Sequence, residues 1–277
     1  MKALSLALIA CPECSSEDIT GTPQPDSRLL IHCADCGHEW LRGEARRDPA
    51  RPHVRSVDTL QGEFPSAADV RPDVRERITA LEAEYIAQKP DADPDVEGFA
   101  SRYRELFQKE NLSSASPEAL LHFATSTTLA NPGNTSGFTR AWKTAGDDKA
   151  ADGVRASIDH LLYGPESLRV EDRLTQLVEG KKGLGFPSFK EPMLTKVLAV
   201  VEPERFLPLL RYSAAADGKK EIAKDVFGLD LPPVDKSSFT AGRVAVWSND
   251  LLRSLVGLES PQEAAAFLRW AKVRPTG

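Results

Sequence analysis

The chain lacks most of the residue patterns that mark a catalytic site. It has no His-Glu-x-x-His, Gly-x-Ser-x-Gly or Walker lysine motif, so the enzyme classes that these motifs mark are not predicted. Only four of its 277 residues are cysteines, and these fall in two close pairs, which leaves no isolated thiol for a nucleophile. No apolar run approaches the roughly 20 residues of a membrane-spanning helix. We therefore predict a non-enzymatic, cytoplasmic binding protein with no membrane partner.

The two cysteine pairs carry the strongest signal in the sequence. Cys11 and Cys14 enclose Pro-Glu, Cys33 and Cys36 enclose Ala-Asp, and eighteen residues separate the pairs. This spacing is typical of a tetrahedral zinc site, because each pair turns tightly and directs two sulfurs at one point. Four sulfur ligands leave no position for an activated water, so we predict a structural Zn²⁺ ion. In a ribbon too small for a core, its binding supplies folding free energy.

The cysteine pairs and the residues before them have two other interpretations, a pair of disulfides and a lipidation signal. Two disulfides would suit an oxidising compartment, whereas the rest of the chain is typical of a cytosolic protein. The stretch Leu8-Ile-Ala-Cys11 resembles a bacterial lipobox, but the apolar run before it is short and its only charge is one lysine. We interpret this run as the first strand of a ribbon, and predict further strands at 28–32 and from 38. His32 and His38 flank the second pair and are expected to face solvent or the strand edge.

The segment Cys33-Ala-Asp-Cys-Gly-His-Glu-Trp40 resembles the zinc ribbons of transcription and nucleic-acid-processing proteins. The resemblance covers about residues 8–42 and does not specify a function, since such ribbons also dock on proteins. We place the ribbon domain at residues 1–45.

Charge is unevenly distributed along the chain. The net charge of −6 is made of −2 in residues 1–58, −6 in 59–98 and +2 in 99–277. Residues 42–55 nevertheless hold five arginines, two acids and two prolines, which predicts an extended basic connector. Its candidate phosphate contacts are Arg42, Arg46, Arg47 and Arg51. A solvated linker is an equally valid interpretation. We assign 46–95 as a basic and then acidic linker that contains one helix, at 72–88.

From residue 96 to the end, the patterns predict a helical domain, so the fold class is mainly α with a small β zinc ribbon before it. Ser116 and Ser260 each precede a proline and are predicted N-caps. The helix at 72–88 has an apolar stripe at Val74, Ile78, Leu81 and Tyr85.

Two glycine-containing segments are candidate phosphate sites. The segment 180–188 joins two predicted helices, which is the outline of DNA-backbone-binding hairpins, and Lys181 and Lys182 would add charge. Prolines at 187 and 192 depart from that pattern, so a plain interhelical turn stays open. The segment 131–137 lacks a following Gly-Lys-Ser/Thr, and we predict an ordinary loop there.

A second resemblance covers about residues 160–272. The series from Gly183-Leu-Gly through Val201-Glu-Pro-Glu-Arg-Phe-Leu-Pro208 to Phe267-Leu-Arg-Trp270 resembles the helical N-terminal region of McrB-type modification-dependent restriction NTPases. The resemblance implies a part in DNA restriction and antiviral defence, with a separate or C-terminally fused AAA+ NTPase and nuclease as partners. The chain has no nucleotide-binding motif, so NTP hydrolysis is not implied.

Three functional hypotheses follow. We favour a DNA-binding or adaptor component of a restriction or anti-phage system, with unmodified or modified DNA as its ligand. The alternative is a protein-protein adaptor that recruits the NTPase or nuclease without contacting nucleic acid. The third is an enzyme whose carboxylates, such as Glu179 and Glu191, come from distant parts of the chain; nothing in the sequence selects such a pair.

Overall fold

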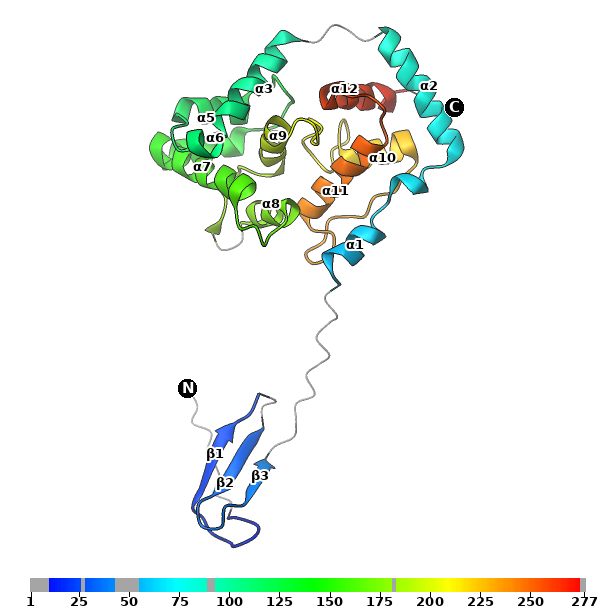
Figure 1. Ribbon diagram of the computed structural model, residues 1–277. Coiled ribbons are helices and arrows are strands. Elements are labelled where there is room, and N and C mark those ends of the chain that lie inside the picture. Colours follow the sequence, from blue (N-terminus) through cyan, green and yellow to red (C-terminus); the bar gives the residue numbers. More distant parts are fainter. Residues whose placement is uncertain (1–9, 26–27, 43–54, 89–92, 181–182, 275–277) are drawn as a thin grey trace. The chain divides into compact units, whose positions relative to one another are not determined.

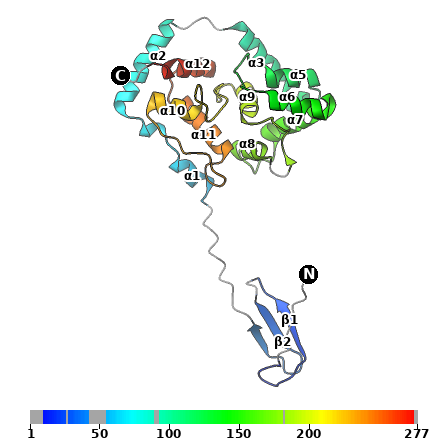
Figure 2. The same cartoon turned by 180° about the vertical axis from the view of Figure 1, so that it is seen from behind.

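A computed structural model describes residues 10–25, 28–42, 55–88, 93–180 and 183–274 (Figures 1 and 2). The chain divides into two compact units, Met1–Ser56 and Val57–Gly277, which are taken separately below. The first holds a small sheet and the second is helical, so the predicted fold class, mainly α preceded by a small β element, is confirmed.

The first unit is a three-stranded antiparallel sheet in the order β1-β2-β3. Its strands are β1 (Ile19–Pro23), β2 (Leu29–Cys33) and β3 (Glu39–Arg42). The last two lie where the sequence predicts strands. The first strand that the structure describes is β1, whereas the apolar run before Cys11, predicted as the first strand, lies almost entirely outside the described residues.

The second unit is built of helices in the described part of the chain. In order they are α1 (Val57–Glu63), the short 3-10 helix η1 (Ala67–Asp69), α2 (Pro72–Gln88), α3 (Pro94–Leu106), α4 (Lys109–Leu112), α5 (Pro117–Thr125), α6 (Ser136–Ala145), α7 (Asp147–Tyr163), α8 (Val170–Glu179), α9 (Glu191–Val201), α10 (Lys219–Phe227), α11 (Ala241–Ser254) and α12 (Pro261–Lys272).

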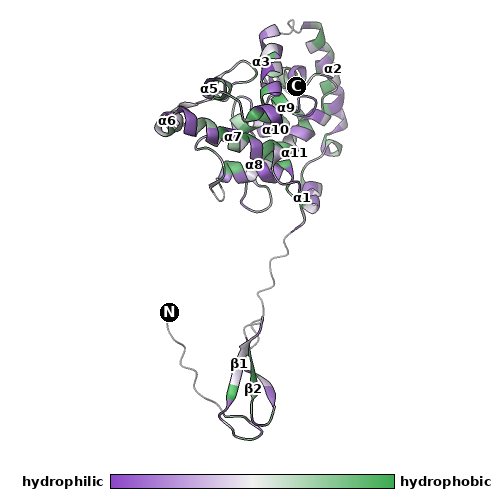
Figure 3. Cartoon of the chain, turned by 60° about the vertical axis from the view of Figure 1, so that its left-hand side comes forward, coloured by the Kyte–Doolittle hydropathy of each residue, from purple (hydrophilic) through white to green (hydrophobic). Residues whose placement is uncertain are grey.

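The helices begin where the sequence supplies caps. The Ser116 hydroxyl accepts a hydrogen bond from the Ala119 amide at 3.2 Å and starts α5. Ser260 does the same for Glu263 at 3.4 Å and starts α12. In both helices proline follows the cap, where its missing N–H costs nothing. Hydropathy alternates along most helices, which is typical of elements that bury one face (Figure 3).

Aromatic rings fill much of the interior of the helical unit. Phe123 is fully buried, and its ring lies 6.0 Å from that of Phe99, 4.9 Å from Tyr103 and 4.8 Å from Phe107 between centroids. These contacts join α5 to α3. The Tyr103 hydroxyl meets Nδ1 of His122 at 2.8 Å, so this histidine has a structural partner.

The linker predicted at 46–95 is shorter than expected, because the helical unit begins at Val57. The helix predicted at 72–88 is present as α2, but it packs into this unit: Tyr85 is buried and lies 5.6 Å from Phe267 and 5.5 Å from Trp270 between ring centroids. An isolated helix with an apolar stripe is marginal in water, and here the last residue of that stripe, Tyr85, packs on α12.

Candidate metal centre

The two cysteine pairs adopt the same backbone turn. The Cys11 amide donates to the Ser16 carbonyl at 2.8 Å, and the Ser15 amide donates to the Cys11 carbonyl at 2.8 Å. In the second pair the Cys33 amide donates to His38, and Gly37 donates to the Cys33 carbonyl, each at 3.0 Å. Ser15 and Gly37 occupy equivalent positions and both have positive φ, 58° and 72°. Two copies of one turn therefore present their sulfurs in the same way.

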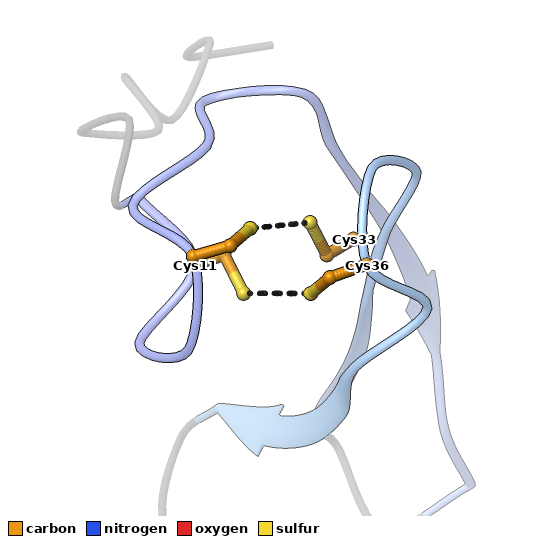
Figure 4. A group of neighbouring side chains, drawn as sticks. Cys11, Cys33 and Cys36 are labelled. Carbon is orange, nitrogen blue, oxygen red and sulfur yellow. Dashed lines mark hydrogen bonds between the residues drawn. The ribbon is translucent and has the colours of Figure 1, made fainter.

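The four sulfurs converge on one point (Figure 4). Cys11 Sγ lies 3.6 Å from Cys36 Sγ, and Cys14 Sγ lies 3.6 Å from Cys33 Sγ. All four atoms lie within 4.8 Å of one another. A disulfide requires about 2.05 Å between sulfurs, and all four cysteines are free thiols, so the disulfide interpretation is not supported.

This separation fits a metal ion. Four sulfurs at about 2.3 Å from the centre of a tetrahedron lie about 3.8 Å apart, close to the 3.6 Å seen for the two pairs. Four thiolates in a tetrahedral arrangement suit zinc or iron. The predicted ligands Cys11, Cys14, Cys33 and Cys36 are thus placed together, and they are the one group of three or more potential metal ligands among the residues that the structure describes.

Neighbouring groups hold the two turns together and favour thiolate at Cys33. The Ser16 hydroxyl hydrogen-bonds the Asp35 carboxylate, and the Ala34 amide donates to the Asp18 carbonyl at 2.9 Å. The backbone amide of Cys36 hydrogen-bonds the Cys33 sulfur and lowers the pKa of that thiol to about 7. Thiolate is the form that binds metal, so Cys33 is the thiol most ready for coordination. Backbone hydrogen bonds from Ser16 and His38 act in the same direction on Cys14 and Cys36, but burial and hydrogen bonds with the other thiols outweigh them and raise the pKa of both.

The two flanking histidines, predicted to face solvent or the strand edge, each have a partner other than the cysteines. Nδ1 of His32 lies 3.3 Å from the Glu39 carboxylate, in an exposed pair. The His38 ring stacks on Trp40 with 5.5 Å between ring centroids.

The predicted nucleic-acid contacts are mostly beyond what the structure describes. Arg42 is the last residue of β3 and is half-buried. Arg46, Arg47, Arg51, Lys181 and Lys182 lie outside the described residues.

The glycine-containing turn after α8 is anchored by aromatic side chains. Phe186 and Phe189 are buried, and their rings each lie 5.8 Å from that of Phe138 in α6. A Cβ atom on Gly137 would lie 3.3 Å from Ser188 Oγ, so the two glycine-containing segments singled out in the sequence come into contact. Packing of these aromatic side chains is enough to explain the conformation of the described part of the turn.

Two buried lysines, Lys196 and Lys219, are not predicted from the sequence. Lys196 is fully buried, donates to the carbonyls of Phe123 and Ser126 at 3.0 and 2.6 Å, and has its pKa lowered to about 7 by burial. Burial also lowers the pKa of Lys219 to about 8, an effect that the negative charge of Glu191 opposes. The available signal was Lys196 itself, which stands alone as a charge between apolar residues of α9.

Glu191 and Glu179 were the example of a carboxylate pair drawn from distant parts of the chain, and the structure gives Glu191 other partners. It is the acid near Lys219, its carboxylate accepts from the Tyr212 amide at 2.5 Å, and burial raises its pKa. Glu179 is exposed at the end of α8. Glu191 is thus engaged with the backbone and a buried lysine.

Comparisons with known proteins leave the chain without an assigned family. No family model, no curated protein and no solved structure matches it. Among the described residues, no helix combines the length and apolar character required to cross a membrane. The resemblance to McrB-type proteins therefore stays a prediction, and what is shown is a four-cysteine centre able to hold a metal ion, in a chain that is otherwise mainly helical.

Proposed function

We propose that the protein is a DNA-binding or adaptor component of a restriction or anti-phage defence system, stabilised by a structural zinc ion. The observation that carries the proposal is the four-cysteine centre, which is followed directly by a segment with five arginines in residues 42–55. Zinc is favoured over iron because it binds four thiolates without redox chemistry, which suits a structural role. A filled shell of four sulfurs leaves the metal no catalytic position.

The arginine segment supplies the contact with DNA in this proposal. Arginine pairs with phosphate through a planar fork of donors, and each neutralised phosphate releases a counterion. The resemblance to McrB-type proteins supports a cytoplasmic role beside a separate or fused AAA+ NTPase and nuclease. The helical unit would then couple the DNA-binding ribbon to that motor, and the chain would perform no hydrolysis by itself.

The test is a fluorescence-anisotropy titration of the zinc-loaded protein with matched duplexes, unmodified and base-modified, at two salt concentrations. Replacing Arg42, Arg46, Arg47 and Arg51 by glutamate should weaken binding at least about tenfold. If all four contact phosphate, the slope of log affinity against log salt should fall by about 3 to 4. A Lys181→Glu/Lys182→Glu variant tests the second predicted contact in the same way.

A matched control separates local contact from net charge. Arg140, Lys143, Lys149 and Lys236 are exposed on the helical unit, and their replacement by glutamate changes the net charge by the same amount. This variant should bind duplex within about twofold of the wild type. Equal weakening by both quadruple variants would show that overall charge alone governs binding and would refute the proposed interface.

One observation favours the alternative, a protein-protein adaptor. The cysteine turns of the ribbon carry the acids Glu13, Glu17, Asp18 and Asp35, and like charge repels a phosphate backbone. This acidic end suits a basic protein surface. This alternative predicts that the protein binds no duplex at low salt. It also predicts that a pull-down, after nucleic acid has been digested away, still recovers an NTPase or nuclease partner. Both results together would establish the adaptor function in place of DNA binding.

A further inference from the structure

One face of the ribbon sheet carries an aromatic pair. In β3 the side chains of Trp40 and Arg42 lie on the same face, because alternate residues of a strand point the same way. Trp40 is opposite Ile31, which is opposite Gly21 in β1. The His38 ring, just before β3, stacks on Trp40 with centroids 5.5 Å apart and an interplanar angle of 24°.

The two faces of this sheet differ in charge. Glu39 lies opposite His32 and pairs with it, on the face away from Trp40. The strand residues on the Trp40 face are apolar, glycine, proline or cysteine, apart from Arg42. No carboxylate of the described strands therefore lies on the Trp40 face, although the ribbon as a whole is acidic.

Gly21, on the same face as the aromatic pair, has no side chain and so leaves room for its cross-strand neighbour. A Cβ atom on Gly21 would approach Ile31 Cδ1 to 3.2 Å, so the bare backbone of β1 gives the Ile31 side chain its place. Ile31 is buried, while Trp40 and His38 are only half-buried. The result is a ring surface at one edge of the sheet, with a guanidinium two residues further along the strand.

We propose that Trp40, supported by His38 and followed by Arg42, binds an unpaired base of single-stranded nucleic acid. Every base has a π-face that stacks on an aromatic side chain, and an arginine beside it can pair with the adjoining phosphate. Bases inside a duplex are already stacked on one another, so only an unpaired base can use the ring. This inference rests on the proposed function, and it narrows the ligand to a strand with exposed bases.

The test uses the full zinc-loaded chain with a twelve-residue oligothymidine and a twelve-base-pair duplex as probes. Trp40→Leu keeps an apolar cover over Ile31 but removes the ring, and Trp40→Phe keeps a smaller ring. Affinity for oligothymidine should fall at least about fivefold in Trp40→Leu and less in Trp40→Phe. Oligothymidine should also quench tryptophan emission in the wild type, and that quenching should be lost in Trp40→Leu.

Two controls make the result decisive. One metal ion per chain in each variant shows that the ribbon is folded, and Leu41→Ala, on the opposite face and 44% exposed, should bind like the wild type. Unchanged oligothymidine affinity in a metal-loaded Trp40→Leu protein would overturn the inference. If that variant also binds duplex through its arginines, the proposed function stands without the base site. Failure of the wild-type protein to bind either probe would refute both.

Discussion

The two units of this chain obtain their stability from different sources. Among the described residues of the ribbon, only Cys11, Ile31 and Cys33 are buried apolar or sulfur side chains. The helical unit buries an extended core that joins α2 to α12 through aromatic contacts. Hydrophobic burial contributes about 25 cal/mol per Å², so the helical unit can fold on its core. The described ribbon has little such core, but its four sulfurs are placed to hold a metal ion, whose binding would supply folding free energy.

Because the two sources of stability are separate, a single change should affect one unit and spare the other. The metal centre is local, since its four ligands come from residues 11–36 alone. The core of the helical unit draws only on residues from 57 onward. Chelation and core substitution are therefore independent tests of the two sources of stability.

The largest effect is expected from loss of the metal. Chelation, or Cys11→Ser, should unfold the ribbon, because structural zinc contributes about 10–16 kcal/mol to small zinc domains at pH 7. Two-dimensional NMR should show the ribbon amide signals collapse, while the melting temperature of the helical unit shifts by less than about 2 °C. Persistence of the ribbon signals in excess chelator would contradict a metal-held fold.

A smaller effect, confined to the other unit, is expected from Phe123→Ala. Removal of this fully buried ring from its contacts with Phe99, Tyr103 and Phe107 should cost about 3–5 kcal/mol of the free energy of unfolding, measured in urea by circular dichroism. Metal stoichiometry should stay the same. Val273→Ala, at a side chain that is 78% exposed, is the control and should change stability by less than about 0.5 kcal/mol.

The smallest effect is a dependence on pH within the helical unit. Lys196 has a pKa of about 7 in the folded state, against 10.5 for a solvated lysine. Between pH 7 and pH 10.5 the unfolded chain holds a proton on Lys196 that the folded chain has released. The contribution of Lys196 to the free energy of unfolding therefore rises with pH over this range. The slope is at most about 1.4 kcal/mol per pH unit, and below pH 7 the contribution is constant and least favourable.

Lys196→Met should remove that slope. The free energies of unfolding of the wild type and the variant, measured in urea at pH 7, 8 and 9, should differ by an amount that changes with pH. Lys224→Met, at an exposed lysine of α10, should leave the slope as it is. Parallel curves for the wild type and Lys196→Met would show that Lys196 keeps an ordinary pKa in the folded protein.

The metal ligands could be predicted because cysteine spacing is a local pattern. Ligand type, turn geometry and pair separation all lie within 26 residues, from Cys11 to Cys36. β1 was harder to predict, since Ile-Thr-Gly-Thr-Pro contains two residues that are unfavourable in strands. Its extended form follows from pairing with β2, from Ile19 opposite Cys33 to Pro23 opposite Leu29, which is a tertiary effect.

The helical unit shows the same limit. The caps at Ser116 and Ser260 and the apolar stripe of α2 are visible in the sequence, since each depends on residues close together in the chain. That α2 packs on α12, so that 57–88 belongs to the helical unit, depends on residues far apart. Burial of Lys196 against two carbonyls of α5 and the turn after it is equally non-local, and only its apolar neighbours indicate it.

The pairing of α2 with α12 has a consequence for synthesis of the protein on the ribosome. Tyr85 is translated long before Phe267 and Trp270, whose rings cover it in the folded protein. The ribbon needs nothing beyond Arg42, so it can fold during translation once it captures a metal ion. The helical unit must instead wait until Phe267 and Trp270 have been made, and its first long helix stays uncovered until then. A chaperone would be most useful during that interval.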